Sequence, residues 1–323
     1  MIFPKAEWIM DFQNPTEALT GKRTSVQGFS VYKDYAVILY HSGVCAVYDL
    51  ITRDPAPLSA FKLESYDAGE EDKRYANHAN DMMFGGVDEA GNPLMYITAG
   101  NSGEADEKGY IAYCAVEALD ITYDADGKVQ FGSHLVQKIY YKNDGIENVP
   151  FQSPCWGWPA SLVDVKNGLF YLHSARYRTT KDFVHLYNEN NYIVTAFPLP
   201  PIGAGYEEVT LTPADIVDQF EYPYDILATQ GGTIFEDKLY YTFGFGKVGT
   251  PIGMRIADLK EKKLISRVDF SFTPFGKVEI ECCAPYAGKM LINTQHDKET
   301  GLGQIYAFDP KELESDKVFP PMQ

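Results

Sequence analysis

A short unit of hydrophobic and polar positions recurs along the chain. Residues 26–43, VQGFSVYKDYAVILYHSG, combine a polar and small start, an apolar run, a two-residue polar turn and a second apolar run. Residues 229–246 and 280–297 match this segment without gaps. Because two apolar runs joined by a short polar turn are typical of a β-hairpin, the pattern predicts three copies of one hairpin.

Two longer copies fill the middle of the chain, at residues 78–103 and 155–178, each with a lengthened first turn. A third apolar run follows every copy. Fourth strands are predicted at residues 57–65, 134–142, 217–224 and 263–271, whereas the fifth copy lacks one. The N-terminal residues 6–14 have the aromatic, alternating pattern of that missing strand. The copies start at equivalent positions, which are Gln27, Asn80, Trp158, Gln230 and Glu281.

Four strands in each of five irregularly spaced units are typical of propeller blades. The chain resembles the β-propeller superfamily, and the resemblance covers almost all of it. It implies an all-β, five-bladed β-propeller whose N-terminal strand completes the last blade, with residues 1–323 as a single domain. Helical signals are sparse; residues 212–220 alone predict a short helical turn, beginning at Thr212 and Pro213.

Composition supports this fold and restricts the partners. Apolar residues make up 45% of the chain and aromatic residues 14%, which suits a large β core. A net charge of −17 disfavours nucleic acid and anionic membranes as partners. No apolar run is long enough to span a bilayer, and no signal peptide is evident, so a cytoplasmic location is expected; a secreted protein that has lost its leader is the alternative. The cysteine spacing predicts reduced, mostly buried thiols, and a disulfide between Cys282 and Cys283 is the other option.

The propeller topology brings two sets of residues to one face, here called the top. First strands begin there, and the loops from second to third strands return there. A ligand pocket at that face is therefore predicted. Its candidate ligand-binding residues are Gln27, His41, His78, Asn80, Trp156, Trp158, His173, Arg176, Arg178, Gln230 and His296. Contact of Gln27 with Gln230 and Glu281 across the ring is also predicted.

Three carboxyl groups are the candidate catalytic residues. Glu279 and Glu281 share one strand face, so their repulsion is expected to raise one pKa, and Asp81 is a further candidate partner. Arg176 and Arg178 suit the binding of a carboxylate, sulfate or phosphate. Each residue also has a structural interpretation: hydrogen bonding between strand ends, core packing of the tryptophans, or surface salt bridges of the arginines.

These residues predict a protein that binds or processes a glycan, including an acidic one, because aromatic, amide and acidic side chains suit sugar rings. Five-bladed glycoside hydrolases are similar in plan, although they place Asp where this chain has Gln27. A hydrolase-like or lyase-like activity is one hypothesis, and a non-catalytic binding scaffold is the other. No cofactor is expected, although a divalent metal bound by His41, His78, His173 and His296 is an alternative. A small-molecule or glycan ligand is the expected partner, and the sequence does not indicate an oligomeric state.

Overall fold

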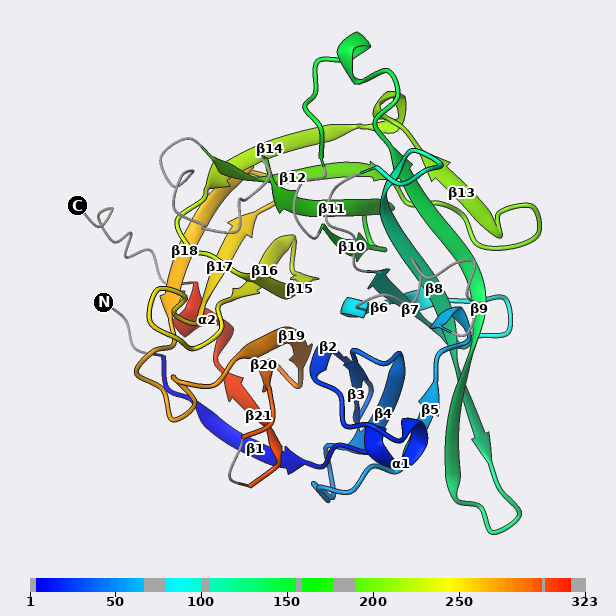
Figure 1. Cartoon of the computed structure of the whole chain (residues 1–323), viewed down its shortest axis with the longest axis vertical. Coiled ribbons are helices and arrows are strands. Elements are labelled where there is room, and N and C mark those ends of the chain that lie inside the picture. The colour runs from blue at the N-terminus through cyan, green and yellow to red at the C-terminus, as the bar shows by residue number, and fades with distance from the viewer. Residues whose placement is uncertain are drawn as a thin grey trace.

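Five small sheets surround a central axis in the computed structural model, which describes residues 4–66, 79–99, 105–154, 159–176, 190–297 and 300–314 (Figure 1). The first strand of each sheet lies next to the axis, and the fourth lies outermost except in blade 2, where a fifth strand lies beyond it. The predicted five-bladed β-propeller is thereby confirmed. Blade 1 contains β2 (Val26–Tyr32), β3 (Tyr35–Tyr40), β4 (Val44–Asp49) and β5 (Ser59–Lys62).

The other blades follow in chain order around the ring. Blade 2 contains β6 (Ala79–Val87), β7 (Pro93–Ala99), β8 (Tyr110–Tyr123) and β9 (Val129–Lys142). Blade 3 contains β10 (Ala160–Asp164), β11 (Leu169–Ala175), β12 (Asn191–Pro198) and β14 (Asp218–Pro223). Blade 4 contains β15 (Thr229–Phe235), β16 (Lys238–Phe243), β17 (Gly253–Asp258) and β18 (Lys263–Asp269). Blade 5 contains β19 (Ile280–Tyr286), β20 (Lys289–Thr294), β21 (Gly303–Phe308) and the N-terminal β1 (Glu7–Phe12).

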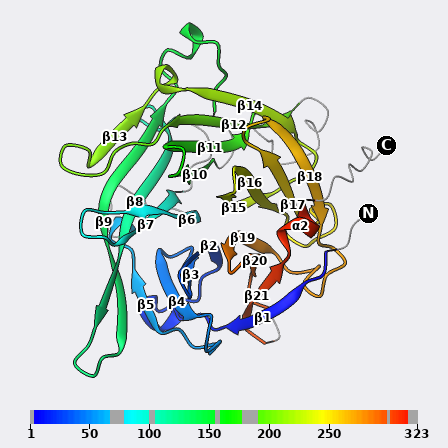
Figure 2. The ribbon, with the colours of Figure 1, turned by 180° about the vertical axis from the view of Figure 1, so that it is seen from behind.

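The N-terminal strand closes the ring as the sequence predicts. β1 pairs with β21 in antiparallel register, with Phe12 opposite Gly303. The two strands lie side by side in both views (Figures 1 and 2). Because these strands come from opposite ends of the chain, the last blade forms only when both ends meet.

Two features of blade 2 were not predicted. β8 and β9 are each 14 residues long, and their hairpin extends past the ring in both views (Figures 1 and 2). Along its length the hairpin packs on blade 1, where Phe131 makes an edge contact with Tyr35 at a ring distance of 5.0 Å. β13 (Glu208–Leu211) then pairs with β9 in parallel and adds a fifth strand. The long hairpin therefore contacts blade 1, and β13 covers the outer edge of blade 2.

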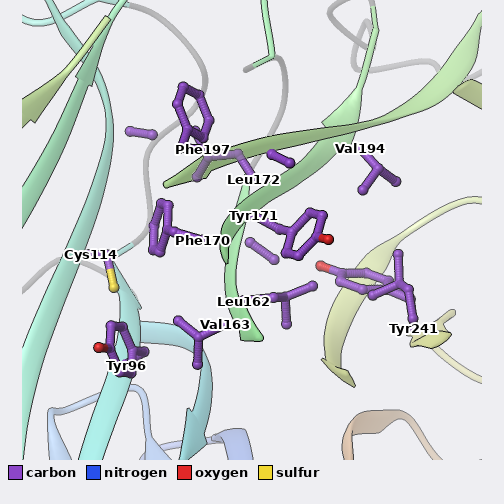
Figure 3. Close-up of a cluster of buried hydrophobic side chains, with 14 of the residues drawn as sticks. Tyr96, Cys114, Leu162, Val163, Phe170, Tyr171, Leu172, Val194, Phe197 and Tyr241 are labelled. Atoms are coloured by element: carbon purple, nitrogen blue, oxygen red, sulfur yellow. The ribbon is translucent and has the colours of Figure 1, made fainter. Parts of the chain in front are cut away.

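The hydrophobic core lies between neighbouring blades. Figure 3 shows Tyr96 and Cys114 of blade 2 on one side of blade 3, and Tyr241 of blade 4 on the other side, around Val163 and Phe170. All five side chains are nearly inaccessible to solvent. Since each blade packs its two faces against two neighbours, removal of one large side chain weakens the joint between blades.

The remaining elements are short. α1 (Thr16–Thr20) follows β1 and α2 (Pro310–Leu313) follows β21, and 3₁₀ turns span Glu64–Tyr66, Ile146–Asn148 and Pro213–Asp215. The last of these replaces the helical turn predicted for residues 212–220, and Asp215 accepts hydrogen bonds from the backbone and hydroxyl of Thr212. None of the described helices has the length and apolar content needed to cross a membrane.

The cysteine prediction is confirmed where it can be checked. Cys45, Cys114, Cys282 and Cys283 are free and buried. Cys282 and Cys283 form no vicinal disulfide, and their thiols point to different partners: Asp81 and the Tyr240 carbonyl. Cys155 lies outside the described residues.

Candidate functional site

In four blades the first strand begins with the same irregularity. The pairing with the second strand shifts by one residue immediately after Val26, Ala79, Thr229 and Ile280. The residue that follows each of these therefore lies at a β-bulge, which redirects a side chain and ends regular pairing. These bulge residues are Gln27, Asn80, Gln230 and Glu281, the equivalent positions that the sequence repeat predicts.

A second repeated contact closes the top of three blades. The residue after the second strand donates its backbone N–H to the carbonyl of the residue before the first strand. The distances are 2.9 Å from His41 to Ser25, 2.8 Å from Gly244 to Ala228 and 2.8 Å from Gln295 to Glu279. Loop and strand start are therefore held together at the top, as the topology predicts.

Gln230 and Glu279 form the outer part of a polar group at the top end of the axis. The Gln230 amide donates a hydrogen bond to Glu279 Oε1 at 2.9 Å, and thereby joins blades 4 and 5. Both side chains are half-buried. Burial raises the pKa of Glu279, while the Gln230 hydrogen bond and the charge of Lys247 oppose the rise. A carboxyl group with a raised pKa is therefore accessible from the top face.

Glu281 and Gln295 form the inner part. The Gln295 side-chain amide pairs with the backbone of Val26 as a neighbouring strand would. Its Oε1 accepts from Val26 N–H at 3.1 Å, and its Nε2 donates to the Val26 carbonyl at 2.7 Å. The same amide donates to the Glu281 carboxyl. Burial raises the pKa of Glu281 well above its usual range, with a further contribution from the charge of Glu279. Blades 5 and 1 are thus joined through the Gln295 amide, which also donates to the buried Glu281 carboxyl group of its own blade.

Gln27 completes this group from blade 1. Its amide donates to the Val26 carbonyl at 2.7 Å and to Ser25 Oγ at 3.3 Å. The Val26 carbonyl also accepts from Gln295, which donates to Glu281, so Gln27 is linked to Glu281 only indirectly; among the described residues no hydrogen bond joins it directly to Glu281 or to Gln230. We call Gln27, Gln230, Glu279, Glu281 and Gln295 the axial cluster.

Asp81 lies beneath the axial cluster and connects three blades. Its Oδ1 accepts from Met82 N–H at 2.7 Å and from the Cys282 thiol at 3.0 Å, and its Oδ2 accepts from Gly232 N–H at 3.0 Å. The side chain is 1% exposed. Burial raises its pKa to about 7, and the three hydrogen bonds limit the rise. The carboxyl group of Asp81 therefore titrates near neutral pH.

Small residues make room for Asp81 at the equivalent positions of blades 1 and 4. A Cβ on Gly28 would lie 2.7 Å from Met82 N, and a Cβ on Gly231 would lie 2.6 Å from Asp81 Oδ1. Real Cβ atoms do not approach other atoms so closely. First strands of opposite blades, such as β6 and β15, also come within 8 Å of each other between Cα atoms. The axis is therefore tightly packed at this level.

We expect Gly231→Ala to destabilise the protein by about 1–3 kcal/mol, because overpacking forces a buried neighbour to move. The matched control is Gly132→Ala on β9, where a Cβ would meet nothing within 4 Å. Urea denaturation followed by circular dichroism measures both. Equal free energies of unfolding for the two variants would show that Asp81 is not confined by Gly231.

His173 does not lie in a top-face loop as the sequence suggests. It lies within β11, paired with Ala160 and Val194, and is fully buried. Its Nε2 is 2.6 Å from the Tyr222 hydroxyl, and its ring packs at 4.0 Å from the ring of Tyr241. Burial lowers its pKa to about 3, so the ring is neutral and belongs to the core between blades 3 and 4.

His296 and Arg176 have protein partners near the top face. The His296 ring lies between Tyr40 and Phe12, at ring distances of 6.1 and 5.4 Å, and burial lowers its pKa to about 4. Arg176 forms an ion pair with Glu221 at 3.5 Å. The sequence suggests that Arg176 binds a ligand anion. Its ion pair with Glu221 competes with such binding.

Other predicted site residues are only partly described. His41 is half-buried and contacts Ser25 through its backbone. Asn80 is placed by its backbone in β6. His78, Trp156, Trp158 and Arg178 lie outside the described residues. Within the described residues, no group of three or more His, Cys, Asp or Glu side chains is arranged to hold a metal ion.

Sequence reasoning missed the contact of Asp81 with Cys282 and the role of the glycines beside it. The signal was present, because Gly28, Asp81, Gly231 and Cys282 each follow the bulge residue of their copy. One large and three small residues at one level of a ring indicate that the large one occupies the centre.

Three solved structures have a distant likeness to the chain. No family model matches the chain, and no curated protein matches it in sequence. The glutaminyl cyclase of Myxococcus xanthus is 8% identical, with a TM-score of 0.47 over 95% of this chain and 98% of that one. The tail fiber of a Staphylococcus aureus phage is 12% identical, with a TM-score of 0.48 over 95% of this chain and 53% of the fiber, so this chain spans about half its length. The Dos1 propeller is 10% identical, with a TM-score of 0.36 over 87% and 67% of the two chains.

Proposed function

We propose that the top end of the axis binds a carbohydrate through the axial cluster. The observation that carries this proposal is the pair of carboxyl–amide hydrogen bonds, from Gln230 to Glu279 and from Gln295 to Glu281. Gln230, Glu279 and Gln295 are half-buried and held in place, and such amide and carboxyl groups suit the hydroxyl groups of a sugar, which both donate and accept. The ordered cluster also lowers the entropic cost of binding.

A neutral sugar fits this cluster better than an acidic one. Glu279 and Glu281 both lie at the site, and Arg176, which with Arg178 is a candidate partner for a sugar carboxylate, is already paired with Glu221. A lyase-like reaction on acidic sugars would need such a cation. The proposal therefore favours neutral glycans.

Catalysis is the second part of the proposal. Both carboxyl groups have raised pKa values, and that of Glu281 lies further above its usual range because it is more deeply buried. Two carboxyl groups with different proton affinities are what glycoside hydrolysis requires. In this role Glu279, which is accessible, contacts the sugar, and its charge helps to raise the pKa of the buried Glu281.

The non-catalytic alternative also has an observation in its favour. Glu281 and Gln295 are already bonded to protein groups that join blades 5 and 1. If their role is only to hold blades together, the top face is a binding surface without turnover.

The test is a glycan array followed by calorimetry on any glycan that binds. We expect Glu279→Ala to weaken binding about tenfold, which corresponds to the loss of about one charge-assisted hydrogen bond. Glu279→Gln keeps hydrogen-bonding capacity, so it should keep binding and lose any hydrolysis. Gln130→Ala on the β8–β9 hairpin is the control. Absence of binding to every glycan, or equal binding by Glu279→Ala and the control, refutes the assignment; binding without hydrolysis by the wild type identifies a binding protein.

A further inference from the structure

Two arginines face each other on the outer side of blade 4. Arg255 of β17 and Arg267 of β18 are direct partners in the antiparallel register. Like charges at such positions repel one another and destabilise a sheet. Arg255 is nearly buried, at 8% exposure, so water screens the repulsion poorly.

A single carboxylate lies between them. Asp225, in the segment after β14, accepts from Arg255 Nε at 2.8 Å and from Arg267 Nε at 2.5 Å. Arg255 also donates through Nη1 to the Met254 carbonyl at 3.0 Å. Within the described residues, Asp225 is the only group to which Arg267 donates, so its Nη donors are available. The single negative charge of Asp225 thus neutralises only one of the two arginine charges.

A cavity of about 290 Å³ adjoins Arg267. It is lined by Glu221, Tyr222 and Pro223 of β14 and by residues 262–267 at β18, so it lies in the outer wall between blades 3 and 4. This size is close to the lower end for small-molecule sites. The outer strands β14 and β18 are far along their sheets from the axial cluster (Figure 1).

The cavity has an excess of positive charge in an acidic protein. The charged residues that line it and their ion-pair partners in the described chain comprise four cations and four anions, and Arg255, which shares Asp225 with the lining residue Arg267, adds a fifth cation. The cations are Arg176, Arg255, Lys262, Lys263 and Arg267, and the anions are Asp218, Glu221, Asp225 and Glu261. The surplus is the second arginine that shares Asp225.

We propose that this cavity binds a small molecule through a carboxylate or phosphate group. The anion accepts from the Nη groups of Arg267 and supplies the negative charge that the arginine pair lacks. Arginine suits this role because its planar group presents several donors to an oxyanion. The site is independent of the axial cluster and of the carbohydrate proposal.

Calorimetric titration of the full chain at low ionic strength tests the proposal, with inorganic phosphate and succinate as separate probes. We expect Arg267→Gln to weaken binding of the active probe about tenfold or more, as expected for a lost charge-assisted contact. The control is Lys260→Gln, which removes a cation that pairs with Asp237 away from the cavity. It should bind as the wild type does, and sodium chloride should compete only weakly.

Asp225→Asn provides a test of opposite sign. It leaves two arginines without a carboxylate, so the probe should bind about tenfold more tightly than to the wild type. Binding of phosphate alone would indicate a phosphorylated ligand, and binding of succinate alone would indicate a carboxylated one. Either result supports the site. No heat with either probe, or equal affinities of Arg267→Gln and Lys260→Gln, overturns the proposal. The comparison of Arg267→Gln with Lys260→Gln tests the proposal even if Asp225→Asn does not fold.

Discussion

Replacement of Asp81 by asparagine is expected to remove about 4 kcal/mol of the pH dependence of folding stability between about pH 4 and pH 7. The pKa of Asp81 is about 7 in the folded protein, because burial penalises its charge, against 3.8 for an ordinary aspartate. The folded state therefore binds a proton that the unfolded state has released. This stabilising contribution is fully present below pH 4 and is lost as the pH rises through 7.

The measurement is the free energy of unfolding by urea at a series of pH values. Asparagine is as large as aspartate but does not titrate, so the slope against pH is informative even if the variant is less stable overall. Asp126→Asn, at the exposed tip of the β8–β9 hairpin, is the control and should keep the wild-type slope. Glu281, whose pKa is also raised, continues to contribute in the same direction in both variants. An unchanged slope in Asp81→Asn would show that the buried carboxyl group does not take up a proton on folding.

The repeat in the sequence was enough to predict the blades. Lys33–Asp34 and Glu236–Asp237 form the predicted hairpin turns, and Gln27, Gln230 and Glu281 occupy equivalent bulges. Local pattern succeeds here because a hairpin is specified by its own turn and by the alternation of its strands.

The pattern within one hairpin could not predict contacts that cross the ring. Asp81 of blade 2 contacts Cys282 of blade 5 at a separation of 201 residues, and even within blade 3 Arg176 pairs with Glu221 of β14, which lies 45 positions later and outside its own hairpin. The prediction for His173 was wrong for a related reason. The pattern of one hairpin assigns a polar residue near a strand end to the loop, whereas tyrosines from blades 3 and 4 surround and bury this one. β13 has no counterpart in the other copies, so no repeat could indicate it.

The contacts that cross the ring also fix the positions of the axial cluster, which we propose as a site. Gln295, Gln230 and Asp81 each join different blades by hydrogen bonds. A ligand at the top end of the axis would therefore meet groups whose positions are fixed by several blades at once. Loosening of the ring should reduce affinity even when no ligand contact is removed.

The closing strand is where the ring is expected to be most vulnerable. Phe12 is fully buried at the end of β1, and its ring packs on Gly303 of β21, where a Cβ would lie 2.1 Å from Phe12 Cζ. The ring also contacts Tyr48 of blade 1 at 5.6 Å. Phe12 thus fills the joint between the last blade and the first.

Phe12→Ala should destabilise the protein by about 3–5 kcal/mol, since it removes a large buried ring and Gly303 offers no side chain to fill the space. Trp8→Ala, on the same strand but 51% exposed, should change stability by less than about 1 kcal/mol. Urea unfolding followed by circular dichroism measures both without depending on tryptophan fluorescence. Similar losses for the two variants would mean that β1 contributes through its backbone pairing alone. A loss confined to Phe12→Ala would show that side-chain packing at this joint holds the two ends of the chain together, and glycan binding at the axial cluster should weaken in that variant.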